Sequence, residues 1–227
     1  MPAGGTGLVL RGLRKEPATI GKWHLGWDWT HKEGKAKTVD NIGFTKRVAN
    51  GPTDRGFDYF YGLTSPSGPP HLYMVNDMAE KQPNTRFEES GGGLYKIKGG
   101  IGHSDWSADG MQPHLADKML EYLDENKDSD KPFFLYMALT APHIPLFPSK
   151  EFKGKSKIGD YGDLVMMIDD IVGRVNRKLK EIGKYDNTIV MFAADNGCAG
   201  YINMDRINRK GHYPSYIYRD YKSHGWE

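Results

Sequence analysis

The chain has 227 residues, of which 38% are hydrophobic and 26% are charged, so it carries enough apolar material for a packed core and is not a disordered chain. Its formal net charge is +2, which excludes the strongly basic balance typical of proteins that bind nucleic acids or anionic membranes. A single cysteine, Cys198, excludes an internal disulfide and a cysteine-based zinc cluster, and no apolar run approaches the roughly 18 residues of a membrane span.

The first elements are short. Leu8 to Lys15 is amphipathic and predicts a short helix, and "PATIGKW" predicts a short strand that ends in a glycine turn. Residues 27–110 are polar, aromatic and rich in glycine, with the loop signals "TSPSGPP" and "SGGG". We expect a loop-rich insertion with short strands and turns there.

A helix and a strand follow the insertion. Apolar residues recur at helical spacing from Met111 to Asn126, with Asp109 as a plausible N-cap. Phe133 to Leu139 is a continuous apolar run bounded by prolines. Such a run predicts a strand that is buried on both faces of a sheet.

The last third of the chain repeats this pattern. Helically spaced apolar residues from Tyr161 to Ile182 predict a long helix that ends near Gly183. Thr188 to Ala193 then predicts a second buried strand, followed by the polar residues of "DNG".

The alternation of strands and helices predicts an α/β fold with a mainly parallel sheet and helices on both faces. In such sheets, functional residues gather at the carboxyl ends of the strands. Polar clusters follow all three of the predicted parallel strands, and they contain Lys22 and His24, His143, and Asp195 and Asn196.

The first cluster is "GKWHLG". Residues two apart on a strand face the same side, so Lys22 and His24 could meet one anion while Trp23 turns into the core. The spacing is equally compatible with a surface lysine beside a structural histidine.

The second and third clusters allow two interpretations each. His143 lies between Pro142 and Pro145, and a rigidly held histidine suits acid catalysis, although a loop histidine is often structural. Asp195 and Asn196 offer oxygen ligands of the kind that Ca²⁺ or Mg²⁺ binds, but Asn-Gly is also a common turn signal.

Five segments together resemble one family. "GKWHLG", "GFDYFYG", "APHIPL", "DNTIVMFAADNG" and "YRDYKSHGWE" occur in the order typical of type I sulfatases, which are formylglycine-dependent sulfuric ester hydrolases with an alkaline-phosphatase-like fold. The resemblance covers the chain from about Thr19 to Glu227. It implies that residues 1–227 form part of a sulfatase catalytic domain.

The resemblance also implies roles for six residues. Lys22 and His24 match a pair that contacts the sulfate and the nucleophile, and His143 matches a histidine that binds the sulfate and protonates the leaving oxygen. Asp195 and Asn196 match two ligands of a divalent cation, usually Ca²⁺ and sometimes Mg²⁺. Lys222 matches a lysine that bridges the sulfate and the metal site.

Two elements of the family are missing before Lys22, namely the nucleophile motif and an Asp pair that supplies further metal ligands. The formylglycine nucleophile is made from Cys or Ser in a C/S-x-P-S-R motif upstream of "GKWHLG", and none of the residues before Lys22 match it. "TSPSG", from Thr64 to Gly68, has Thr and Gly where the motif requires Cys or Ser and Arg. We therefore expect a chain that is truncated at both ends relative to the family and inactive by itself.

The resemblance predicts a sulfatase that cleaves a sulfate ester, with a sulfated carbohydrate as the preferred substrate and no nucleic-acid partner. Two alternatives remain open. One is a phosphodiesterase or phosphonate hydrolase of the same superfamily, and the other is a non-catalytic protein that binds sulfated glycans. Relatives are often exported, but this sequence fixes neither the compartment nor the oligomeric state.

Overall fold

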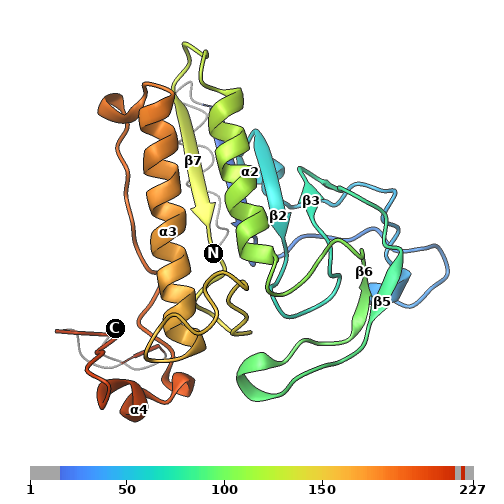
Figure 1. Ribbon diagram of the computed structural model, residues 1–227. Coiled ribbons are helices and arrows are strands. Elements are labelled where there is room, and N and C mark those ends of the chain that lie inside the picture. The colour runs from blue at the N-terminus through green and yellow to red at the C-terminus, as the bar shows by residue number, and fades with distance from the viewer. Residues whose placement is uncertain (1–15, 218–220, 223–227) are drawn as a thin grey trace.

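The computed structural model describes residues 16–217 and 221–222. Its centre is a five-stranded sheet in the order β4-β3-β2-β1-β7, beside a separate two-stranded sheet of β5 and β6 (Figure 1). The strands are β1 (Glu16–Lys22), β2 (Tyr59–Leu63), β3 (Met74–Val75), β4 (Met78–Ala79), β5 (Thr85–Phe87), β6 (Gly100–Gly102) and β7 (Phe133–Ala138).

The helices of the described residues include two long ones, α2 (Met111–Glu125) and α3 (Asp160–Glu181), and the short α4 (Met204–Asn208). Single 3-10 turns occur at η1 (Val39–Asn41), η2 (Thr53–Arg55), η3 (Gly93–Tyr95), η4 (Tyr185–Asn187) and η5 (Gly200–Ile202). The strand at Pro17 to Trp23 and both long helices are therefore confirmed, and the helix predicted at Leu8 to Lys15 lies outside the described residues.

The central part of the sheet is parallel. β1 pairs in parallel with both β2 and β7, so that Gly21 lies opposite Gly62 on one side and Ala138 on the other. β3 and β4 extend the sheet as antiparallel strands. The mainly parallel α/β architecture is confirmed, and β2 belongs to the main sheet although it lies within the loop-rich segment 27–110.

The two faces of the sheet are covered differently. Helices α2 and α3 lie side by side on one face (Figure 1), where their apolar residues pack against Ala18 and Ile20 of β1. The other face presents Phe60 and Met74 to aromatic and aliphatic side chains from residues 23–57. Within the described residues, both long helices thus share one face, and the loop-rich segment covers the other.

The prediction that the strand from Phe133 is buried on both faces is wrong. β7 is the last strand of the sheet, and Tyr136 on its outer face is 51% exposed. Phe133, Leu135 and Met137 point to the other face and pack under α2 and α3. In the described part of the chain, this continuous apolar run therefore forms a strand that is packed by α2 and α3 on one face and partly exposed on the other.

The prediction of a buried strand from Thr188 to Ala193 is also wrong. This segment forms no strand, and Ile189 and Met191 are 87% and 82% exposed. A β-strand needs a neighbour for its backbone hydrogen bonds, and none of the described strands lies beside this segment. Local sequence preference alone does not form a strand.

The start of α2 differs from the predicted cap. Its N-cap residue is Gly110 and not Asp109, and no side chain caps the helix there. The Ser107 hydroxyl accepts a hydrogen bond from the Gly110 N–H at 3.0 Å and fixes the turn that precedes the helix. Along the described ranges, we find no helix with the length and apolarity that a bilayer crossing requires.

Candidate active site

Lys22 is the last residue of β1 and lies at the carboxyl end of the parallel strands. Trp23 turns into the core, where its backbone N–H donates to Leu63 O at 2.8 Å and its indole N–H donates to Gly26 O at 3.0 Å. Lys22 is half-buried and His24 is exposed on either side of this anchor. The buried tryptophan therefore fixes the backbone that carries both cationic side chains.

His143 lies in the loop after β7, the neighbouring parallel strand. Gln112 is 2% exposed, and in the orientation that satisfies both ends of its side-chain amide, its oxygen accepts from the backbone N–H of Thr140 at 3.1 Å. The His143 N–H donates to Thr140 O at 3.2 Å. The imidazole Nδ1–H donates to Ile144 O at 2.6 Å, and the ring of Tyr201 lies edge-on at 6.4 Å. Nδ1 is thus committed to the backbone, which leaves Nε2 for a ligand.

Lys222 approaches the same edge from a distant part of the sequence. Its backbone N–H donates to Cys198 O at 2.9 Å, so it lies beside the turn that contains Asp195 and Asn196. A Cβ atom at Gly197 would lie 3.4 Å from Cα of Tyr221, which shows how closely the two segments approach.

Electrostatic interactions connect these residues. Partial burial lowers the pKa of Lys22, with the Asp195 carboxylate opposing that shift and Lys222 adding to it. The side chain of His24 is exposed overall, but the protein atoms beside it displace some water, and this desolvation lowers its pKa; the nearby charges of Lys22, His143 and Lys222 lower it further. Four groups that can carry positive charge therefore lie close enough to influence one another. We call Lys22, His24, His143 and Lys222 the cationic rim.

The cation ligands are less complete than the cationic rim. Asp195 is exposed and Asn196 is partly exposed, and together they offer oxygen ligands of the type that Ca²⁺ and Mg²⁺ prefer. Ca²⁺ takes about six to eight oxygen ligands. The described residues contain no group of three or more His, Cys, Asp or Glu side chains placed to hold a metal ion. By themselves these residues do not form a full cation site.

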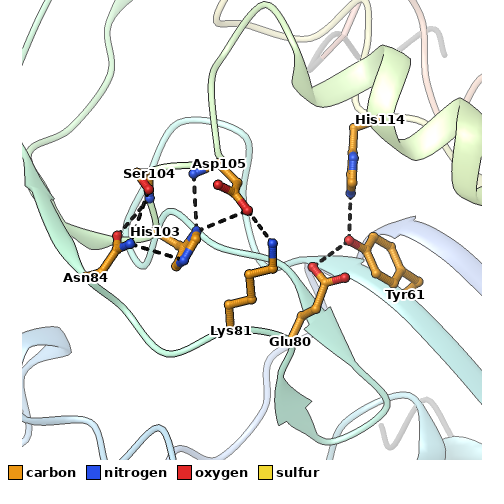
Figure 2. Close-up of polar contacts among 8 residues, drawn as sticks. All are labelled: Tyr61, Glu80, Lys81, Asn84, His103, Ser104, Asp105 and His114. Carbon is orange, nitrogen blue, oxygen red and sulfur yellow. Dashed lines mark hydrogen bonds and ion pairs between the residues drawn. The ribbon is translucent and has the colours of Figure 1, made fainter.

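A second polar cluster was not predicted from the sequence (Figure 2). The Tyr61 hydroxyl of β2 donates to Glu80 at 2.8 Å and accepts from Nε2 of His114, on α2, at 2.6 Å. Burial, and then the Glu80 hydrogen bond, raises the pKa of Tyr61, and burial lowers the pKa of His114. The neighbouring polar contacts join Asn84, His103, Ser104, Asp105 and Lys81. The Tyr61, Glu80 and His114 contacts tie β2 and the segment after β4 to α2, and the remaining contacts tie the segment after β4 to the turn after β6.

Sequence reasoning also missed the residues that position His143. Gln112 is a polar residue on the buried face of α2, and a buried amide needs hydrogen-bond partners, which was the one available signal. Nothing in the sequence pairs Tyr201 with the loop of His143, because that contact joins residues 58 positions apart. Gln112 precedes the His143 loop in the sequence and Tyr201 follows it, and both contact that loop.

Comparison with known proteins identifies relatives along almost the whole chain. The family described as Sulfatase matches residues 9–223. The N-acetylgalactosamine-6-sulfatase of Sus scrofa is 31% identical over 195 residues, which cover 84% of this chain and 32% of that protein. The N-acetylgalactosamine-6-O-sulfatase of Bacteroides thetaiotaomicron is 27% identical over 243 residues, which cover 92% of this chain and 46% of that protein.

Solved structures share the fold. A sulfatase from work on glycosaminoglycan metabolism by Bacteroides thetaiotaomicron aligns with a TM-score of 0.75 at 25% identity, covering 97% of this chain and 52% of that one. A PsFucS1 sulfatase from Pseudoalteromonas sp. aligns with a TM-score of 0.58 at 23% identity, covering 84% of this chain and 37% of that one. The chain thus spans about a third to a half of the proteins that it matches, and it belongs to the sulfatase family.

Proposed function

We propose that this protein acts in the hydrolysis of a sulfate ester on a carbohydrate, with N-acetylgalactosamine 6-sulfate as the substrate class. The convergence of Lys22, His24, His143 and Lys222 at the carboxyl edge of the parallel strands carries the proposal. The names of the two relatives support the choice of sugar. We further propose that residues 1–227 contribute part of a catalytic domain, with a loop-rich insertion at 27–110.

The two lysines bind the sulfate group in this proposal. A sulfate monoester carries one negative charge that is spread over its free oxygens, and these accept hydrogen bonds from ammonium groups. Lys22 is half-buried, which strengthens its attraction to an anion because less water screens the charge. Lys222 approaches from the segment after the "DNG" turn and adds a second positive charge.

His143 supplies the proton. When the sulfur–oxygen bond breaks, the departing alkoxide oxygen needs a proton, and Nε2–H of a protonated His143 can donate it. The bond from Nδ1 to Ile144 O fixes the orientation of the ring and leaves Nε2 as the donor. We assign to His24, which lies near the charge of Lys22, the exchange of a proton with the attacking group.

Asp195 and Asn196 are proposed to contribute two oxygen ligands to a divalent cation, Ca²⁺ or Mg²⁺. When bound, such an ion adds positive charge against the sulfuryl oxygens. The remaining ligands would have to come from groups beyond these two residues. The roles of the lysines and of His143 do not depend on which ion binds.

The attacking group of the family is a formylglycine, and the 227 residues contain no C/S-x-P-S-R motif from which it could form. We therefore propose that the 227 residues supply the groups that bind the sulfated sugar and protonate the leaving oxygen, and that by themselves they bind the sugar without hydrolysing it, because hydrolysis also needs the attacking group. Binding is consequently the property to measure, because the loss of a nucleophile removes most of the rate while leaving the binding groups in place.

The test is a calorimetric titration of N-acetylgalactosamine 6-sulfate into the wild-type chain and a Lys22→Ala variant. Removing one charged hydrogen-bond donor costs about 1.5–3 kcal/mol, so we expect affinity to fall by about 10- to 150-fold. Lys178→Ala is the matched control. Like Lys22, Lys178 is a partly buried lysine, with 19% of its side chain exposed, but it lies in the last turn of α3 and is not part of the cationic rim.

Two outcomes decide the proposal. It stands if Lys22→Ala weakens binding, Lys178→Ala does not, and unsulfated N-acetylgalactosamine fails to bind. Equal affinity for the sulfated and unsulfated sugars, or no effect of Lys22→Ala, contradicts it. Tighter binding of the corresponding 6-phosphate would instead favour a phosphoester substrate.

A further inference from the structure

The structure contains a cavity of about 480 Å³ whose lining includes none of the four residues of the cationic rim. It is bounded by β5, the segment before β6, the turn that leads into α2, and the loop that continues from His143. Its volume falls within the range of about 300–1,000 Å³ that small-molecule sites occupy. Its apolar lining is formed by Phe87, Ile97, Trp106, Phe147 and Pro148.

The apolar lining is held in place by aromatic packing. Trp106 is 4% exposed, and its ring lies 4.5 Å from the ring of buried His71 and edge-on to Phe87 at 5.4 Å. Phe147 packs edge-on against Tyr95 at 5.8 Å. Because these contacts already fix the rings, a ligand would meet a preformed surface and would not have to order it.

The cavity adjoins the candidate active site through one loop. Phe147 follows His143 by four residues, so their Cα atoms are at most about 14 Å apart even if the chain were fully extended. The Leu146 N–H donates to Leu94 O at 2.8 Å and anchors the loop between them. An oligosaccharide whose sulfated unit occupies the cationic rim could therefore place a neighbouring unit in the cavity.

The charges around the cavity favour a neutral ligand. Glu88 and Asp109 balance Lys150 and Lys153, and the Lys153 ammonium also bonds to Asp160 at 3.2 Å. An anion would gain little in this mixed field, since each lysine is offset by a carboxylate. Sugar hydroxyls, however, both donate and accept hydrogen bonds, and they match a lining of carboxylates, ammonium groups and hydroxyls. The C–H face of a sugar ring suits the aromatic walls.

We propose that this cavity is a subsite for an uncharged hexose unit next to the sulfated unit, which makes the protein a reader of oligosaccharides with neutral neighbouring sugars. This inference rests on the proposed function, since the cationic rim positions the sulfated unit. Phe147 provides the apolar wall, and Asp109 accepts hydrogen bonds from the ring hydroxyls.

The test compares three ligands by calorimetric titration. They are N-acetylgalactosamine 6-sulfate, a tetrasaccharide in which 6-sulfated N-acetylhexosamine alternates with galactose, and one in which N-acetylgalactosamine 6-sulfate alternates with glucuronate. We expect the galactose-containing tetrasaccharide to bind about tenfold more tightly than the monosaccharide, corresponding to about 1.4 kcal/mol. The glucuronate-containing tetrasaccharide should gain less, because its carboxylate loses hydration in a cavity where Glu88 and Asp109 offset the attraction of Lys150 and Lys153.

Variants locate the gain in the cavity. Phe147→Ala should remove most of the galactose-dependent gain and leave monosaccharide binding unchanged, while Phe152→Ala, a partly buried phenylalanine outside the cavity lining, should retain the gain. Asp109→Ala tests the polar wall without removing an aromatic ring, and we expect a loss of about three- to tenfold on the tetrasaccharide.

The results separate this inference from the proposed function. A tetrasaccharide that binds no better than the monosaccharide, a glucuronate gain as large as the galactose gain, or equal effects of Phe147→Ala and Phe152→Ala would overturn the subsite. Failure of the monosaccharide to bind would contradict the proposed function alone. The subsite would still be tested, by comparing the tetrasaccharide affinity of Phe147→Ala with that of Phe152→Ala.

Discussion

A single buried polar residue helps to position His143 in the candidate site. Gln112 is not a member of the cationic rim, but the amide orientation that satisfies both of its polar ends lets its oxygen accept from Thr140 N at 3.1 Å, at the start of the loop that carries His143. Ile144 O then orients the His143 ring through Nδ1. The geometry of one imidazole thus depends on a helix residue 31 positions earlier in the sequence.

His71 is the residue with the clearest consequence for pH. It is 1% exposed, one ring nitrogen pairs with Lys98 O at 2.7 Å, and burial lowers its pKa. The neutral ring is therefore favoured in the folded state. Its contribution to stability is complete above the unfolded pKa of about 6.5 and is lost as the pH falls from there toward the folded pKa.

We expect the free energy of unfolding, measured by urea denaturation, to decrease between pH 7 and pH 5 by at most about 1.4 kcal/mol per pH unit for this one group. His71→Gln retains an amide donor for Lys98 O but does not titrate, so it should flatten the decrease. Some slope should remain, because the pKa of His114 is lowered as well. An unchanged slope in His71→Gln would remove His71 from this account.

At the scale of elements, the close approach of β1 and β7 fixes the position of the carboxyl end of β1. Gly21 has φ of +132°, and a Cβ atom there would come within 2.0 Å of Ala138 O in β7. Only glycine adopts this backbone without strain at such a short distance. The residue that precedes Lys22 is thus part of what holds the candidate site at the sheet edge.

Gly21→Ala should therefore destabilise the protein by about 2–6 kcal/mol, since backbone strain and overpacking each cost about 1–3 kcal/mol. Gly92→Ala is the control, because a Cβ atom at Gly92 meets nothing within 4 Å and its φ is −162°. Urea denaturation measures both variants. Similar stability of the two would show that the β1–β7 approach tolerates a side chain.

Elements with their own periodicity were predicted well from the sequence. The helices at Met111 and Asp160 and the strand at Glu16 follow from local patterns that tertiary contacts reinforce. Residues 188–193 were predicted as a buried strand from equally strong local apolarity, and the prediction failed because a strand also requires a pairing partner. The cationic rim could be approached only through motifs and their order, because its members come from distant segments.

For the molecule as a whole, the exposed apolar residues of 188–193 and the outer edge of β7 have a common consequence. Unpaired strand edges and exposed apolar side chains promote association between chains. Ile189 and Met191 are among the most exposed apolar residues of the described chain, and β7 ends the main sheet. We therefore expect association between copies of this chain to depend on these two features.

We expect the wild-type chain to associate as its concentration rises, and the double variant Ile189→Lys, Met191→Lys to associate less with an unchanged circular dichroism spectrum. Ala36→Lys with Thr45→Lys adds the same charge at other exposed positions and serves as the control. Light scattering after gel filtration measures the mass of each. Equal association of the double variant and its control would assign the effect to charge and not to the apolar segment.

The central claim is that the cationic rim binds a sulfate ester, and imidazole NMR signals test it most directly. On titration with N-acetylgalactosamine 6-sulfate, the signals of His24 and His143 should shift with one common dissociation constant, and the pKa of His24 should rise because an anion favours its charged form. His71 and His114 should remain unchanged, and so should all four with unsulfated N-acetylgalactosamine. If His24 and His143 do not respond, or respond equally to the unsulfated sugar, the account is contradicted.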